Sequence, residues 1–231
     1  MERKYYEAYN DRYCQIHSQN LMWFHEEPSQ IVSDVLKRYN RSRSCKILEI
    51  GCGEGRDAIP LLQSGHNLLA TDVSCEAISF CMKKCPDFAD CFQMLDCIAG
   101  ELATKFDYIF SVAVIHMLVQ DFDRNAFYRF IHNHLNHEGI ALICSMGDGN
   151  VEGKTDIRNA FELQDRIHEQ TGKKVRIAST SCRMVTTETF REELTRNGFL
   201  ILEEGLTSVE PDFPTMMYAV IKRTDEQENG I

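Results

Sequence analysis

The chain has 231 residues, of which 43% are hydrophobic, and this size fits one large α/β domain better than two. Its net charge of −10 disfavours a nucleic-acid partner, because phosphate binding needs clustered Lys and Arg residues. The charged N-terminus is unlike a secretory signal, and no stretch approaches the roughly 20 apolar residues of a membrane span. With ten cysteines and no export signal, we expect a cytoplasmic protein whose thiols are free.

Four of the cysteines lie close together in the sequence, namely Cys81, Cys85, Cys91 and Cys97. Their spacings differ from the paired C-x-x-C knuckles of zinc sites, so we expect no metal here. These residues are expected instead to fill the core as small apolar side chains.

Short apolar runs alternate with helical segments as far as residue 147. Strands are predicted over residues 45–50, 67–72, 91–96, 106–114 and 139–147. Helices are predicted over residues 57–65, 74–86 and 123–136, with Ser74 as the N-cap of the second and Gly139 stopping the third. Because strands that alternate with helices are joined by right-handed crossovers, the sheet should be mainly parallel.

The pattern changes after Gly198, where residues 199–208 and 216–223 form two strand-like runs. No crossover helix fits in the short connection between them, so this pair must be antiparallel. The predicted fold class is therefore α/β and doubly wound. Its mainly parallel, seven-stranded sheet should include one antiparallel strand from the C-terminal hairpin.

Residues 148–187 are too many for a plain connection between two strands, and loops of this length usually carry function. Residues 157–172 are predicted to form a helix ending at Gly172, and residues 175–185 an extended segment. We expect this insertion to cap a substrate pocket, with Arg183 and Met184 as candidate substrate contacts. If Arg183 faces the pocket, an acceptor that carries a carboxylate is favoured.

The most informative stretch is "ILEIGCGEGRDA", where a strand runs into glycines and then a helix. Such a turn suits an anion or a ribose, because backbone N–H groups and a helix N-terminus face the ligand. Gly51, Gly53 and Gly55 are spaced as G-x-G-x-G, and Arg56 stands where a dinucleotide fingerprint has its third glycine. No Gly-Lys-Ser/Thr follows, so a P-loop is disfavoured as well.

This stretch, with Asp72 after the second strand, Asp96 after the third and the terminal hairpin, resembles the class I S-adenosylmethionine-dependent methyltransferases. The resemblance covers roughly residues 20–223. Within that superfamily, residues 51–74 are similar to small-molecule methyltransferases of the thiol and thiopurine type. The upstream "LMWFHEEPSQIV" is similar to the Trp-containing segment of the same enzymes.

The resemblance implies S-adenosylmethionine as the cofactor and S-adenosylhomocysteine as the product. It places Glu49 and Gly51 under the methionine amino group and lets the cofactor approach Gly53 and Gly55 closely. It also assigns both ribose hydroxyls to Asp72, which is sound chemistry because a carboxylate accepts two hydrogen bonds at once. A helix cap is the simpler role for this aspartate, but Ser74 is the better cap.

The resemblance also implies which residues lie beside the adenine and methionine ends of the cofactor. Asp96 and Cys97 would border the adenine, and Ser111 and Val112 would line the methionine side. The remaining expected cofactor-binding residues are Trp23, Cys52 and Val73. An acid that ends a strand is often merely solvated, which leaves a simpler role open for Asp96.

Methyl transfer from a sulfonium needs a catalytic base only when the nucleophile arrives protonated. His116 follows the fourth strand, where the family lines its substrate pocket, and is the candidate base and a candidate substrate contact. The alternative is a histidine packed in an apolar turn. Residues 1–40 are rich in tyrosine and are expected to form a helical lid, with Tyr13 as a further substrate contact.

The sequence thus predicts a single methyltransferase domain over residues 1–231, which moves a methyl group by in-line displacement to a small-molecule acceptor. An NAD(P)-dependent oxidoreductase is the first alternative, and Arg56 and the lack of a second substrate domain weaken it. The second alternative is an S-adenosylmethionine-binding protein without catalysis. The identity of the acceptor and the oligomeric state are left open.

Overall fold

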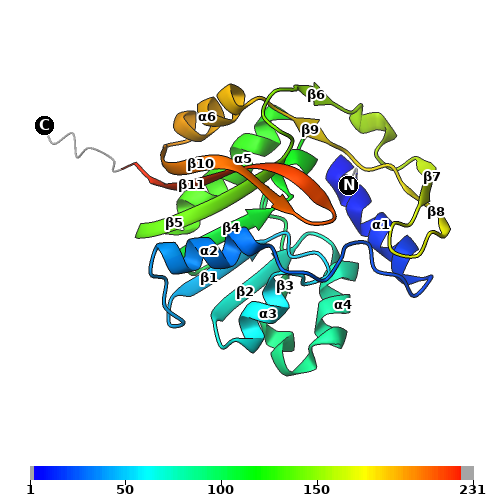
Figure 1. Ribbon diagram of the computed structural model, residues 1–231, viewed down its shortest axis with the longest axis horizontal. Helices are drawn as coiled ribbons and strands as arrows, with labels where there is room; N and C mark the ends of the chain where they lie inside the picture. The colour runs from blue at the N-terminus through cyan, green and yellow to red at the C-terminus, as the bar shows by residue number, and fades with distance from the viewer. Residues whose placement is uncertain (1–2, 225–231) are drawn as a thin grey trace, which may run out of the picture.

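The computed structural model describes residues 3–224, and the main feature of this part is one seven-stranded sheet. Its strands are β1 (Lys46–Ile50), β2 (Asn67–Asp72), β3 (Phe92–Met94), β4 (Phe106–Val112), β5 (Leu135–Met146), β10 (Phe199–Val209) and β11 (Phe213–Arg223). They lie in the order β10-β11-β5-β4-β1-β2-β3 (Figure 1). The first five strands pair in parallel, whereas β11 is antiparallel to both β5 and β10. The predicted fold class is confirmed.

Helices cover both faces of this sheet. They are α2 (Gln30–Arg38), α3 (Ala58–Gln63), α4 (Cys75–Lys84), α5 (Asp121–His134) and α6 (Thr187–Arg196), and a further helix, α1 (Ala8–His17), precedes them in the chain. Successive residues of a strand face opposite sides, so Ile47 packs with α2, α3 and α4, and Leu48 packs with α5 and α6. This arrangement is the doubly wound architecture that the alternating pattern indicated.

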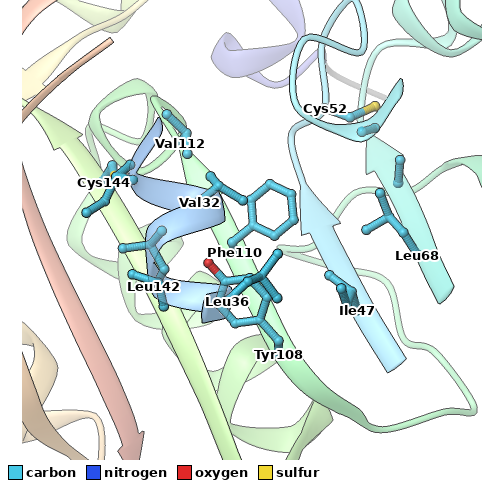
Figure 2. Packing of buried hydrophobic residues seen from close by; sticks show 14 of the residues in the cluster. Val32, Leu36, Ile47, Cys52, Leu68, Tyr108, Phe110, Val112, Leu142 and Cys144 are labelled. Carbon is cyan, nitrogen blue, oxygen red and sulfur yellow. The ribbon is translucent and has the colours of Figure 1, made fainter. Parts of the chain in front are cut away.

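The packing of α2 shows how tightly the sheet is covered near the central strands. In Figure 2, Val32 and Leu36 of α2 lie against Tyr108 and Phe110 of β4. All four side chains are at most 4% exposed. Burial of side chains of this size stabilises the fold by about 1.5–3 kcal/mol each, so α2 holds the central strands as a rigid base for the loops above them.

Local sequence signals determine where α4 begins and where α3 ends. The Ser74 hydroxyl oxygen accepts a hydrogen bond from the Ala77 N–H, as expected of an N-cap. Gly65 follows α3 with φ of +82°, a left-handed conformation that favours glycine after a helix. Both signals are short-range, and both were read correctly from the sequence.

The insertion between β5 and α6 differs from the prediction. Residues 157–172 do not form a helix; they contain a short 3₁₀ turn, Ile157–Asn159, and then the hairpin strand β7 (Leu163–Ile167). β7 pairs with β8 (Lys174–Ala178), and the short strands β6 (Gly153–Lys154) and β9 (Arg183–Met184) form a second pair. Tertiary packing overrides helix propensity here, because Val175 and Ile177 of β8 are buried against Ile16 of α1.

A second correction concerns the end of α5. The helix ends at His134, and β5 begins directly at Leu135, so Gly139 lies inside the strand and does not stop the helix. Leu135 is fully buried and pairs with Phe106 of β4, which extends the strand toward the helix. Among residues 3–224, no helix combines the length and the apolar character needed to cross a bilayer.

Candidate functional site

A cavity of about 380 Å³ lies at the carboxyl ends of the parallel strands. Its lining includes the last residue of three of them, namely Ile50 of β1, Asp72 of β2 and Val112 of β4. Open α/β sheets bind their ligands at this edge, and a volume of roughly 300–1,000 Å³ is typical of small-molecule sites. The cavity is therefore the candidate functional site.

The glycine loop after β1 forms the floor of the cavity. Gly51, Gly53 and Gly55 have φ values of +77°, +52° and +81°, a region that other residues rarely adopt. A side chain on Gly51 would place its Cβ 2.2 Å from Val114 Cγ2, and one on Gly53 would lie 2.7 Å from the Tyr13 hydroxyl. The loop therefore needs glycine both for its backbone conformation and for the space above it.

Asp72 fixes the loop from the end of β2. Its Oδ2 accepts a hydrogen bond from the Gly53 N–H at 2.9 Å, and its Oδ1 accepts one from the Ser74 N–H at 2.8 Å. The side chain lines the cavity, and burial raises its pKa although these backbone donors oppose the rise. Each carboxylate oxygen keeps a second lone pair, so the group can accept further hydrogen bonds from a ligand.

Glu49 lines the cavity one residue before the end of β1. Only 3% of it is exposed, and its Oε2 has no hydrogen-bond partner among the described residues. Burial, reinforced by the nearby Asp57 carboxylate, holds the pKa of Glu49 well above its ordinary value. A buried carboxylate oxygen without a partner is unusual, and in a ligand cavity it marks a binding position for a donor.

The far side of the cavity holds Asp96 and its neighbours. Asp96 accepts hydrogen bonds from Lys4 Nζ at 2.7 Å, the Tyr6 hydroxyl at 3.2 Å and the Ile98 N–H at 2.9 Å. Cys97 lies beside it in the lining, and burial raises the pKa of its thiol. The lining also includes Val73 and Cys52, so all of these sequence-predicted residues meet in one place.

The N-terminal residues cover this floor. Tyr6, Tyr9 and Tyr13, at successive turns of one helical face, all line the cavity. The Tyr9 hydroxyl donates to the Ser181 carbonyl oxygen at 2.9 Å, and Arg12 donates to the carbonyl oxygens of Ala178 and Ser179. The helix α1 is thus held in place by the insertion, as their adjacent positions in Figure 1 show.

The segment between α1 and α2 forms another wall, which we call the strap (residues 22–29). Three carboxylates hold its backbone: Glu54 accepts from the N–H groups of Trp23 and Phe24 at 2.8 and 2.9 Å, Asp57 from Ser29 at 2.6 Å, and Asp212 from His25 at 3.1 Å. Met22, Phe24, His25 and Glu26 of the strap line the cavity. Sequence reasoning missed these contacts, although acids directly after the glycines were a visible signal.

Trp23 is placed differently from the expectation. Its neighbours in the strap line the cavity, but Trp23 is absent from the lining and lies 4.8 Å from the Arg12 guanidinium, ring centre to Cζ. It packs beside Val175 and Ile177 of β8. The indole therefore joins the strap to the insertion.

Four other sequence-predicted residues lie outside the cavity lining: Ser111, His116, Arg183 and Met184. Ser111 is fully buried on the opposite side of β4 from Val112. His116 is 4% exposed, and burial, with nearby Arg124, lowers its pKa to about 3. Arg183 donates to Asp121 Oδ1 at 2.5 Å and to the Val119 carbonyl oxygen, so its charge is already paired.

Met184 follows Arg183 in β9 and lies next to Gly147 rather than in the cavity. All ten cysteines are free, and Cys81 donates to the Gly53 carbonyl oxygen from below the glycine loop at 3.3 Å. In the part of the chain that the structure describes, no group of three or more His, Cys, Asp or Glu side chains is arranged to hold a metal ion.

Part of the chain is similar to a known protein family. Residues 48–141 match a family model described as a methyltransferase domain, a range that contains the glycine loop, Asp72 and Asp96. No curated protein matches the chain in sequence.

Solved structures of low sequence identity share the fold. An S-adenosylmethionine-dependent methyltransferase from Clostridium acetobutylicum is 15% identical and aligns over 95% of this chain and 99% of its own, with a TM-score of 0.64. A 1,6-didemethyltoxoflavin-N1-methyltransferase from Burkholderia thailandensis is 16% identical over 97% and 92%, with a TM-score of 0.69. The glycopeptide N-methyltransferase MtfA, complexed with S-adenosylmethionine, is 17% identical over 88% and 97%, with a TM-score of 0.63.

Proposed function

We propose that this chain, which shares the fold of solved methyltransferases, transfers a methyl group from S-adenosylmethionine to a small-molecule acceptor. The observation that carries the proposal is the cavity at the carboxyl ends of β1, β2 and β4, with its glycine floor and its acidic side chains. Its concave, largely apolar wall with several aromatic side chains suits a small acceptor better than a folded macromolecule. S-adenosylmethionine supplies the activated methyl group.

The cofactor half of the cavity is assigned to the glycine loop and its neighbours. Gly51, Gly53 and Gly55 give the cofactor close access to the backbone, and Asp72 accepts from the two ribose hydroxyls with its free lone pairs. The unpaired oxygen of Glu49 accepts from the methionine ammonium group. Apolar walls come from Cys52, Val73, Cys97 and Val112.

Asp96 has a double role in this proposal. It borders the adenine, and its carboxylate also binds Lys4 and Tyr6 of the N-terminal segment. Cofactor binding and the closed position of this segment are therefore linked through one side chain. Trp23 and Ser111 contribute indirectly, because Phe24 and Val112 beside them line the cavity.

Residues 1–40, of which 1–2 lie outside the described residues, serve as a helical lid, and residues 148–187 as the insertion that supports it, within one methyltransferase domain. Tyr9 and Tyr13 of α1 line the cavity, and an aromatic face suits the sulfonium cation of the donor. The contacts of β8 with α1 support the lid position. Arg183 pairs with Asp121, and this pairing weakens our expectation of a carboxylate acceptor bound by Arg183.

The chain has two tasks in the reaction. It must hold the acceptor in line with the sulfur–methyl bond, which gives most of the acceleration through orientation, and it must exclude water from the cavity. The tyrosines of α1 and the strap close the site on the side away from the sheet. Both tasks depend on the shape of the cavity more than on chemically reactive side chains.

The proposal is tested by incubating the protein with trideuteromethyl-labelled S-adenosylmethionine and a panel of thiols, phenols, amines and carboxylic acids, followed by mass spectrometry. We expect at least one acceptor to gain the labelled methyl group, and Asp72→Ala to abolish the gain. Excess S-adenosylhomocysteine should inhibit the reaction as its product. Methylation of the thiols in the panel would support the resemblance to thiol and thiopurine methyltransferases. Absence of transfer by a protein that binds the donor would favour a non-catalytic binding role.

A further inference from the structure

A histidine–carboxylate pair lies in the wall of the cavity. His25 of the strap lines the cavity, and its Nδ1 lies 2.9 Å from Oδ1 of Asp212, at the tip of the β10–β11 hairpin. The other oxygen of Asp212 accepts the backbone N–H of His25 at 3.1 Å. Two bonds to one carboxylate fix both the position and the orientation of the imidazole.

The surroundings hold this pair rigidly. Only 8% of the Asp212 side chain is exposed, and Arg56 Nη1 lies 3.5 Å from its Oδ2. The Arg56 guanidinium faces the Phe24 ring at 5.6 Å, and Phe24 packs on Phe213 with ring centres 5.7 Å apart. Arg56 thus lies beside the carboxylate and is itself packed on an aromatic pair, while the carboxylate binds the histidine.

The geometry of the ring leaves one nitrogen for a ligand. A carboxylate beside Nδ1 stabilises the tautomer with its proton on Nδ1, so Nε2 carries the free lone pair. Among residues 3–224, Nε2 has no hydrogen-bond partner, and 26% of the side chain is exposed. A base held by a carboxylate and open to a cavity is the arrangement that general-base catalysis needs.

His116, the histidine that the sequence favoured, has none of these features. It lies outside the cavity lining, and its buried Nδ1 has no hydrogen-bond partner among the residues that the structure describes. Arg124 lies close enough to disfavour a positive charge on its ring. The His116 ring therefore has little access to the cavity or to solvent, whereas the His25 ring lines the cavity and is partly exposed.

We propose that His25 is the general base of this enzyme and that Asp212 is the positioning residue which orients it. The inference rests on the proposed function. It names the acceptor class as one whose nucleophile arrives protonated, namely a hydroxyl, a thiol or an ammonium group. As the bond from the acceptor atom to the methyl carbon forms, the sulfur–carbon bond breaks and its electron pair stays on sulfur. The proton of the acceptor moves to His25 Nε2, before the bond forms when the acceptor is an ammonium group, and then leaves to solvent.

The first test needs no acceptor. Two-bond ¹H–¹⁵N correlation spectra of the protein saturated with S-adenosylhomocysteine should show neutral His25 protonated on Nδ1. In Asp212→Asn the Nε2-protonated form should increase, because the carboxylate that selects the tautomer is gone. An Nε2-protonated His25 in the parent protein would overturn the proposal. Failure of S-adenosylhomocysteine to bind at all would instead count against the proposed function.

The second test compares binding with turnover. In His25→Gln the affinity for S-adenosylhomocysteine should stay within a factor of about two, while kcat for a panel acceptor falls about 100-fold or more, the usual contribution of a general base. His137→Gln is the matched control at an exposed position and should leave both quantities unchanged. Equal turnover by His25→Gln contradicts the base role. A tenfold loss of S-adenosylhomocysteine affinity would contradict it too, because it would make His25 a cofactor contact.

Discussion

The floor and the cover of the cavity are built from the chain in opposite ways. The floor, the glycine loop after β1, lies within one continuous stretch, residues 46–74, and its shape depends on three glycines and on Asp72. The cover consists of α1 and the strap, which line the cavity, together with the insertion and the hairpin tip that hold them, and its contacts join distant residues. Tyr9 and Ser181 are 172 positions apart, and His25 and Asp212 are 187 apart. A local spacing can encode the floor, whereas only the finished fold defines the cover.

The largest loss of stability is expected from a substitution in the floor. Gly51→Ala should cost about 2–5 kcal/mol, because it combines a left-handed backbone with overpacking against Val114. Gly65→Ala is the matched control, since Gly65 has a φ of +82° but open space around it, and should cost only about 1–2 kcal/mol. Urea unfolding measures both. Equal losses would show that the floor tolerates a side chain over Gly51.

The cover should be weakened most by the loss of Arg12. This buried guanidinium donates to two carbonyl oxygens of the insertion and to the Thr180 hydroxyl. We expect Arg12→Ala to destabilise the protein by about 2–3 kcal/mol through the unsatisfied acceptors and the lost packing. Arg3→Ala removes an exposed arginine from the same end and should cost less than about 1 kcal/mol.

Limited proteolysis distinguishes a local from a global effect of Arg12→Ala. Early cleavage within residues 148–187, with the sheet intact, would show that the cover opens independently of the floor. Cleavage throughout the chain at one rate would instead make floor and cover a single cooperative unit.

Glu54 joins the two regions, because it belongs to the floor and binds the backbone of the strap. Glu54→Gln should cost about 1–2 kcal/mol, since the amide offers one acceptor oxygen to three donors, Trp23, Phe24 and His17. Glu76→Gln neutralises the other, more exposed partner of His17 and should cost less than about 1 kcal/mol. Thermal unfolding of both variants checks this order. An equal cost would mean that the strap does not depend on Glu54.

The smallest expected change in stability is an increase instead of a loss. Because burial raises the pKa of Glu49, its ionised form destabilises the ligand-free protein increasingly as the pH rises above the ordinary value of 4.5. Glu49→Gln should therefore raise the ligand-free stability by on the order of 1 kcal/mol at pH 7, and by less near pH 4. The same variant should bind S-adenosylhomocysteine more weakly. Lower stability at pH 7 would show that Glu49 is paired in solution.

The floor was predictable because each of its signals acts over a few residues. The glycine spacing, the Ser74 cap and the strand that ends at Asp72 were all visible without the fold. At the end of β4, the position of a residue in the sequence did not indicate whether its side chain faces the cavity. Ser111 and Val112 are adjacent, yet alternation in a strand puts only Val112 in the cavity.

The cover was less predictable because its residues are selected by tertiary contacts. The helix expected over residues 157–172 is a hairpin, since pairing with β8 and packing on Ile16 outweigh its local pattern. His116 follows β4 as predicted, but its ring turns into the core while Met117 and Leu118 beside it line the cavity. Nothing near His25 in the sequence indicates Asp212, which only the hairpin brings beside it.

Calorimetric titration with S-adenosylmethionine, S-adenosylhomocysteine and NADH, repeated on Asp72→Ala, tests the central claim most directly. Asp87→Ala, an exposed aspartate after α4, is the matched control. We predict that the first two ligands bind, that NADH does not, and that Asp72→Ala weakens binding at least about tenfold, the loss expected for hydrogen bonds to a charged group. Binding of NADH alone, or of S-adenosylhomocysteine equally to both aspartate variants, would contradict the account.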